Sequence, residues 1–462
     1  MLTMFKVRRR WWYASAVALA GLMLVGLLAV WDMRMRQAPH LGFAPSEAQW
    51  LAFAPDFPAF SAALQTSDPV QRVLSKIPAG ETSMASVAGW TRFWIGGPIL
   101  FSEGAGSWGC CLRPGAALRI TCWLKEKTGR PALFGRLHYC WRDGFLLASE
   151  SQGYLALAMN APRVDGLTPP QSTNALKFQM HWQDRALASN PAQKLEATLW
   201  AGPELHIEGR AMLDAAFAGG GTLTLPDAWS TPPLLILAGG THDDLDAMLR
   251  WFSKTLPEDG TLALAFPGAA DTVGRLWQTL ATVCPAETAI VCRGIDFSGA
   301  IPVPEVGLVA LRPTGGTMSE ALSPFVSTPE AIRYAWGRRE GWQLPLLGSE
   351  GTLCMTTVQP YWLFAAQERT MAALLDGLQG GRPADANLAL RLDWRQLSGV
   401  LSEVLLRAAR WELLPECNEA DVCRDWLPLC EATGDLGQAA IDAQAWGGWL
   451  QFKGQLSRRS QP

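Results

Sequence analysis

Residues 11–31 read WWYASAVALAGLMLVGLLAVW and contain no charged residue. A helix of this length rises about 31 Å, which matches the hydrocarbon core of a lipid bilayer. Trp11 and Trp12 stand at one end and Trp31 at the other, as in the aromatic belts at membrane–water interfaces. The stretch therefore predicts a single-pass transmembrane helix that anchors the rest of the chain to a lipid bilayer.

The charges on either side of this helix predict its orientation. Lys6 and the triplet RRR at residues 8–10 precede the helix, whereas Arg34 and Arg36 follow it. The flank with more Lys and Arg stays in the cytoplasm, so we expect a cytoplasmic N-terminus and an extracytoplasmic body. A cleaved signal peptide has a shorter apolar region that ends in small residues, whereas this run ends in VWDMR at residues 30–34. We therefore expect an uncleaved signal anchor.

The composition describes a chain that can bury a large core and does not bind nucleic acid. It is 49% hydrophobic and 18% charged, with a net charge of −3 and no basic tail. Binding to phosphates needs clustered cations, so nucleic acid is excluded as a partner. There are 22 Trp and 5 Tyr, and some of these Trp are expected on the surface.

Ten cysteines are present, and none lies in a C-x-x-C pair. Cys284 and Cys292 flank a short segment, and Cys417, Cys423 and Cys430 form a cluster. An extracytoplasmic body permits disulfides, so a Cys284–Cys292 bridge and one within the cluster are candidates, although spacing does not fix the pairing. The alternative is that many of the ten are small buried apolar residues.

Pro- and Gly-rich segments and shifts in composition divide the chain. The segment GGGTLTLPDAWSTPP is the best domain boundary. We expect a cytoplasmic basic flank (1–10), the transmembrane helix (11–31), a stalk (32–45), a first αβ module (46–218), a linker (219–233), a second αβ module with a cysteine-containing insert (234–456) and a tail (457–462).

Four short patterns recur in the same order in both halves and indicate an internal duplication. They pair residues 112–114 with 311–313, 144–148 with 361–365, 176–182 with 388–394, and 205–209 with 450–454. The third pattern alternates apolar and polar residues and ends in Trp182 and Trp394, which is typical of a half-buried strand. We therefore expect an α+β fold with two duplicated modules, each of mainly antiparallel sheet with helices on one face.

This arrangement resembles uncharacterised bacterial exported proteins built from tandem αβ modules behind an N-terminal membrane anchor. The resemblance covers most of the chain after residue 45. It implies a cell-envelope location and brings no catalytic residues with it.

Candidate chemistry is sparse. His242, Asp243, Asp244 and Asp246 form the densest group of possible metal ligands, but acids in the first turn of a helix complement its dipole without a metal. Glu103, in a predicted loop, has no partner acid that the sequence can assign. The chain lacks the G-x-S-x-G, H-E-x-x-H and P-loop motifs. We therefore expect no metal and no cofactor.

These observations leave three hypotheses. The leading one is a non-enzymatic, membrane-anchored envelope protein that binds or scaffolds another envelope protein. The second is a glycan or peptidoglycan binding module that uses exposed Trp, for example the pairs Trp90/Trp94 and Trp446/Trp449. The third is a hydrolase with dispersed catalytic residues, which a pocket with two close carboxylates, or with a carboxylate beside His242, would favour.

Overall fold

The computed structural model describes most of the chain between Trp50 and Ser457, in segments separated by gaps. These segments are residues 50–71, 94–104, 107–127, 132–133, 137–142, 144–160, 174–182, 193–224, 232–255, 277–298, 303–315, 317–323, 330–336, 339–345, 352–365, 367–378, 386–411 and 418–457. The predicted transmembrane helix at residues 11–31 and the stalk at 32–45 lie outside them. Within the described segments, no helix combines the length and apolar character needed to cross a bilayer.

The chain is an α+β protein with a large antiparallel sheet and few helices, which confirms that part of the expected fold class. Its strand pairs in the described residues are antiparallel. The chain divides into two compact units. Unit 1 comprises Met1–Thr66, Ala79–Gln183 and Glu196–Gly202, and unit 2 comprises Ser67–Pro78, Asp184–Leu195 and Pro203–Pro462.

Unit 1 is built on strands that pair in the order β7, β1, β2, β3, β6, β5, β4. Its elements are β1 (Trp50–Ala54), α2 (Phe57–Thr66), β2 (Ile95–Gly104), β3 (Ser107–Pro114), α5 (Ala116–Lys127), β4 (Ala132–Leu133), β5 (Leu137–Arg142), β6 (Phe145–Ser149), α6 (Gln152–Asn160) and β7 (Ala175–Trp182). A further strand, β8 (Gln193–Trp200), follows in the sequence.

Helices cover both faces of the unit 1 sheet, so the expectation of helices on one face is wrong. Leu147 of β6 packs with Tyr154 and Leu155 of α6. Its neighbour Leu146 packs in a different cluster, with Leu118 of α5. Successive residues of a strand point to opposite faces. The reason is visible in β6, which is apolar at consecutive positions and therefore needs cover on both sides.

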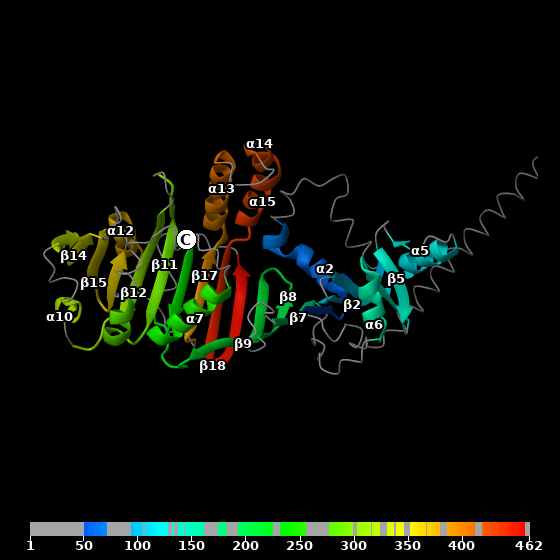
Figure 1. Cartoon of the computed structure of the whole chain (residues 1–462), viewed down its shortest axis with the longest axis horizontal. Helices are drawn as coiled ribbons and strands as arrows, with labels where there is room; N and C mark the ends of the chain where they lie inside the picture. Colours follow the sequence, from blue (N-terminus) through cyan, green and yellow to red (C-terminus); the bar gives the residue numbers. More distant parts are fainter. Residues whose placement is uncertain are drawn as a thin grey trace, which may run out of the picture. The chain divides into compact units, whose positions relative to one another are not determined.

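Unit 2 pairs its strands in the order β9, β18, β17, β10, β11, β12, β16, β15, β14, β13 (Figure 1). The strands are β9 (Leu205–Phe217), β10 (Leu235–Gly239), β11 (Thr288–Asp296), β12 (Val303–Leu311), β13 (Ile332–Trp336), β14 (Arg339–Pro345), β15 (Thr352–Val358), β16 (Tyr361–Ala365), β17 (Leu388–Asp393) and β18 (Gln438–Ser457). The helices are α7 (His242–Thr255), α10 (Met318–Ala321), α12 (Glu368–Gly377), α13 (Trp394–Arg410), α14 (Glu419–Asp421), the π-helix η1 (Val422–Trp426) and α15 (Leu427–Gly434).

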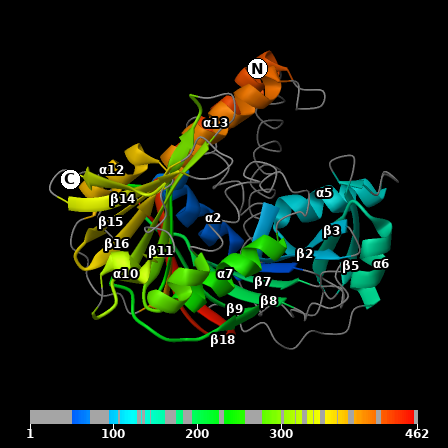
Figure 2. The same cartoon turned by 60° about the vertical axis from the view of Figure 1, so that its left-hand side comes forward.

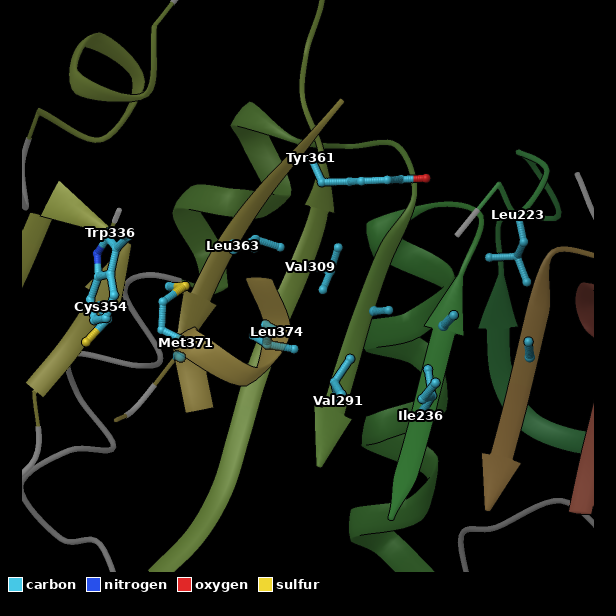
Figure 3. Packing of buried hydrophobic residues seen from close by; sticks show 14 of the residues in the cluster. Leu223, Ile236, Val291, Val309, Trp336, Cys354, Tyr361, Leu363, Met371 and Leu374 are labelled. Carbon is cyan, nitrogen blue, oxygen red and sulfur yellow. The ribbon is translucent and has the colours of Figure 1, made fainter. Parts of the chain in front are cut away.

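Both faces of the unit 2 sheet are also covered. Ala238 of β10 lies in the cluster that Met371 and Leu374 of α12 complete, and Figure 3 shows these two side chains beside those of β11, β12 and β16. The next residue, Gly239, faces α7, because a Cβ added there meets Leu245 Cβ at 2.9 Å. Helix α7 contacts β9, β10 and β11, and Figure 2 shows α7 in green beside β9.

The two units share a strand order from β7 to β4 and from β17 to β14. The predicted match of residues 176–182 with 388–394 agrees with the backbone register. Lys177 of β7 lies opposite Phe53 of β1, and Ala389 of β17 lies opposite Ala238 of β10. Trp394 nevertheless begins α13, capped by Asp393, whereas Trp182 is the last residue of β7.

Two of the other predicted matches fall on corresponding strands but are shifted by one residue. Leu112 packs against α5, whereas Leu311 packs against the cluster of α12, so the two face opposite sides of their sheets. Gly109 of β3 lies against α6, the helix after β6, and Gly307 of β12 lies against α12, the helix after β16. The two glycines are therefore structural counterparts. Residues 144–148 are likewise displaced by one, because Leu147 corresponds to Leu363 through these pairings. Short apolar motifs identify the strand but not its register.

The fourth match, of residues 205–209 with 450–454, stays a prediction. β9 and β18 are antiparallel neighbours within unit 2, with Leu205 opposite Leu456 and Phe452 opposite Gly209. The match would equate Leu205 with Leu450 and Leu456 with Ala211, and Leu450 is itself opposite Ala211, so the register agrees with it. β9 also lies in unit 2, whereas the sequence placed residues up to 218 with the first module.

Candidate functional site

A groove of about 790 Å³ opens in unit 2 between β13 and α12. Its walls come from β13, which is the last strand in the order, from α12 and from the end of β11. The lining residues are Asp296, Tyr334, Ala335, Trp336, Arg339, Gln367, Glu368, Arg369, Ala372, Leu375 and Asp376.

Two aromatic side chains form the strand side of the groove. Tyr334 and Trp336 are two residues apart on β13, so both point toward α12, and their ring centroids are 4.8 Å apart at an angle of 56°. Trp336 is 8% exposed and belongs to the core cluster, where Figure 3 shows it beside Cys354. The Tyr334 hydroxyl donates to Glu368 Oε1 at 2.9 Å, and this hydrogen bond raises the pKa of Tyr334.

Arg369 fixes the first turn of α12 to the sheet. Its guanidinium lies 2.8 Å from Asp296 Oδ2, forms an ion pair with Glu305 and donates to Gln367 Oε1 at 3.0 Å. The Ser298 main-chain N–H, together with Arg369, lowers the pKa of Asp296. These three acceptors engage Arg369, so its role is structural.

Arg339 is the available cation of the groove. Its side chain is exposed, and within the described residues it has no hydrogen bond or ion pair. A guanidinium in this state can bind a carboxylate through two parallel hydrogen bonds.

The outer edge of β13 is open in the described part of the chain, where β13 pairs only with β14. Glu340 of β14 turns its carbonyl oxygen toward β15, since it accepts from Thr356 Oγ1 at 3.0 Å. Ala335 lies opposite Glu340, so in an antiparallel ladder it turns its own N–H and C=O away from β14. The groove therefore combines aromatic rings, a free cation and an open strand edge.

The carboxylates of the groove have polar partners. Asp296 is paired with Arg369, and Glu368 accepts from Tyr334. Asp376 also has an interaction partner. A general acid needs a raised pKa and a nucleophile needs access to substrate, whereas Asp296 has a lowered pKa.

The acids of the His242 cluster lie at the start of α7, with Asp243 and Asp244 in its first turn, and Thr241 caps the helix. The main-chain N–H of Asp244 donates to Thr241 Oγ1 at 3.1 Å. Asp246 accepts from Trp277 Nε1 at 2.9 Å and pairs with Arg250 at 2.7 Å. Within the segments that the structure covers, no group of three or more His, Cys, Asp or Glu side chains could hold a metal ion.

His242 itself is buried among apolar groups. It is 1% exposed, its ring centroid lies 4.2 Å from that of Trp277, and neither ring nitrogen has a hydrogen-bond partner. Burial lowers the pKa of His242, although Asp246 and Asp243 oppose this effect. A neutral imidazole is the form that fits this site.

The candidate disulfide residues carry free thiols where the structure describes them. Cys284 and Cys292 are both free, as are Cys423 and Cys430, and Cys417 lies outside the described residues. Cys284 packs against Leu280, whereas the Cys292 thiol donates to the Gly294 carbonyl. Burial raises the pKa of Cys284 to about 12, as expected for a small core residue.

Of the other candidates, some lie outside the described residues and Glu103 is placed differently from the sequence expectation. Trp11, Trp12, Trp31 and Trp90 lie outside the described residues. Glu103 lies in β2 directly opposite Trp108, and not in a loop. The β13–α12 groove was not predicted, although the alternation of Ile332, Tyr334 and Trp336 is the signal that could have indicated its strand.

Comparison with known proteins gives no relative: no family model matches the chain, and neither a curated protein nor a solved structure is detectably similar to it.

Proposed function

We propose that the chain is a non-enzymatic, single-pass membrane protein of the cell envelope that binds another protein through the β13–α12 groove. The anchor is residues 11–31, with Trp11, Trp12 and Trp31 at the interfaces, a cytoplasmic N-terminus and an extracytoplasmic body. The charge-free apolar run and its basic N-terminal flank support this topology. The composition supports a partner other than nucleic acid.

The body consists of two modules that arose by duplication of one ancestral sheet. The shared strand order of the two units supports this proposal, and so does the equivalent placement of Gly109 and Gly307. Strand β13 lies beyond the part of the order that the described strands of unit 1 match. The groove therefore belongs to the part in which the second module differs from the first.

The proposed ligand is an extended segment of a partner protein that adds as a strand to β13. The outward N–H and C=O of Ala335 are the observation that carries this proposal. In strand addition the main-chain hydrogen bonds supply affinity, and pockets for alternate side chains supply specificity. Here Tyr334 would receive an apolar side chain, and Arg339 would receive a carboxylate.

The test uses the full chain in detergent micelles and a display library of random dodecapeptides. Peptides selected on the wild-type chain are then measured against Ala335→Pro, which removes the outward N–H, and against Ala335→Val, which keeps it. Proline is tolerated on edge strands, so the fold should persist in the first variant. We expect at least tenfold weaker binding to Ala335→Pro and little change with Ala335→Val.

A second pair of variants tests the groove itself. Arg339→Gln should weaken binding and reduce its dependence on salt, whereas Arg333→Gln changes a cation of β13 that does not line the groove. Selected peptides that bind Ala335→Pro as tightly as wild type would refute strand addition. A concentration-dependent dimer lost in Ala335→Pro would show that the strand comes from a second copy of the chain.

A further inference from the structure

A second surface of unit 2, distinct from the β13–α12 groove, gathers exposed aromatic residues on β18. Trp446 is 46% exposed and Trp449 is 40% exposed, although a regular strand would place residues three apart on opposite faces. The sheet register shifts between Gly447 and Trp449, and Gly447 has a φ of +57°. Across it, five residue steps of β9 lie opposite two of β18, and an irregularity of this kind redirects the side chains that follow it.

The burial pattern shows that the two Trp side chains share one face. Before the irregularity, Ala443 and Ala445 are buried, and after it Phe452 and Gly454 are buried. The buried positions therefore change from odd to even across Gly447 and Gly448, and the exposed positions change from even to odd. Trp446 and Trp449 consequently project from the same side, at most roughly 10 Å apart along the strand.

Among the described side chains around these rings, apolar and hydrogen-bonding groups lie together and the charged groups have partners. Met212 of β9 lies opposite Trp449 and is 39% exposed. Beyond it, Gln451 lies opposite Arg210, which has a partner of its own. The next pair is Lys453 and Glu208, whose charged groups are 3.3 Å apart.

We infer that this face of β18 and β9 binds a neutral polysaccharide chain. Sugar rings carry C–H groups on their faces and hydroxyls at their rims, so they stack on indole rings and hydrogen bond to side chains at the border. Exposed apolar patches with a polar rim mark interaction sites, and the paired ions here give no attraction for an anionic ligand. Two indoles on one strand provide platforms for successive rings of a single chain.

The experiment measures retention of the full chain, in detergent micelles, on three insoluble neutral polysaccharides: chitin, cellulose and curdlan. The test variant is Trp446→Ala/Trp449→Ala, and the conservative variant is Trp446→Tyr/Trp449→Tyr. The matched control is Trp411→Ala/Trp426→Ala, which removes two Trp that are 48% and 51% exposed elsewhere in unit 2. Near-ultraviolet circular dichroism verifies that each variant is folded.

We expect wild type to be retained on at least one of the three polysaccharides, with an affinity unchanged between 0.1 and 1 M NaCl. The alanine variant should lose at least tenfold in affinity, while the tyrosine variant and the Trp411/Trp426 control keep most of it. Retention that persists in the alanine variant, falls equally in the control, or disappears in 1 M NaCl overturns the inference. Absence of retention on all three polysaccharides also overturns it.

The result is independent of the proposed peptide site. Ala335→Pro should leave polysaccharide retention unchanged, and Trp446→Ala/Trp449→Ala should leave peptide binding unchanged. Failure of either proposal is therefore recognised without reference to the other.

Discussion

Replacing Gly109 by Ala tests whether α6 packs on β3 as closely as the structure shows. A Cβ added at Gly109 lies 2.2 Å from Cε1, 2.7 Å from Cζ and 2.8 Å from Cδ1 of Tyr154. The Tyr154 ring is 4% exposed, and its hydroxyl is hydrogen bonded to Ser102 Oγ. The ring must therefore shift within a packed core and give up this hydrogen bond.

The magnitude follows from these contacts. Overpacking of a core costs about 1–3 kcal/mol, and a buried hydroxyl without its partner costs a further ~1–3 kcal/mol. The preference of strands for Ala over Gly returns about 0.5–1 kcal/mol. We expect a net loss of about 2–4 kcal/mol, which lowers the melting temperature by roughly 5–15 °C for a unit of this size.

The assay is thermal unfolding of the full chain followed by intrinsic Trp fluorescence. Gly97→Ala is the matched control, because a Cβ there has nothing within 4 Å. Gly307→Ala should lie between the two, since its closest contact, at 2.5 Å, is the flexible end of Leu374. In a Tyr154→Leu background the effect of Gly109→Ala should shrink by at least ~1 kcal/mol. Equal melting temperatures for Gly109→Ala and Gly97→Ala would refute the packing argument.

Three further predictions address the buried histidine, the thiols and the anchor. Since burial lowers the pKa of His242, the unfolded chain binds more protons than the folded chain below about pH 6.5, so stability should fall from pH 7.5 to 5.5. The melting temperature of His242→Phe should depend less on pH than that of wild type. The control His206→Gln, at an exposed histidine, should show the same pH dependence as wild type. Iodoacetamide at pH 8 should modify the exposed Cys423 before Cys110 and Cys354, because burial raises the pKa of these two thiols to about 12. After denaturation without reductant, peptide mapping should find Cys284 and Cys292 alkylated. A linked Cys284–Cys292 peptide pair would contradict the structure. Alkaline phosphatase fused after Pro462 should be active in a bacterial host, with the mature chain beginning near Met1, and an inactive fusion would reverse the proposed topology.

The elements with a strong local signal were predictable from the sequence. Residues 241–255 have acids at their start and Leu245, Met248 and Leu249 on one helical face, which predicts a helix, and α7 spans His242–Thr255. Alternation predicted a strand at residues 176–182, and β7 spans Ala175–Trp182. In both cases, the period of apolar residues and the capping chemistry are contained in a single segment.

Consecutive apolar residues in two strands are the sequence signal for helices on both faces of the sheet. In β6 and β16, consecutive apolar side chains are buried, among them Leu146 and Leu147, and Trp362 and Leu363. A strand with one solvated face alternates, whereas a strand covered on both faces is a continuous apolar run. These two strands therefore required helices on both sides of the sheet, which α5 and α6 provide in unit 1.

The two proposed binding surfaces could not be predicted, because each depends on contacts between distant parts of the chain. The groove needs α12 beside β13, which Arg369 secures through Asp296 of β11 and Glu305 of β12. The face of Trp446 and Trp449 depends on an irregularity whose place is set by pairing with β9, more than 200 residues earlier in the sequence. Read as a regular strand, the sequence puts these two Trp on opposite faces, where one would be buried. Only the change of register between Gly447 and Trp449 exposes both Trp side chains. The register shift is therefore the feature that creates the surface, and for this reason we attribute a function to the two Trp residues.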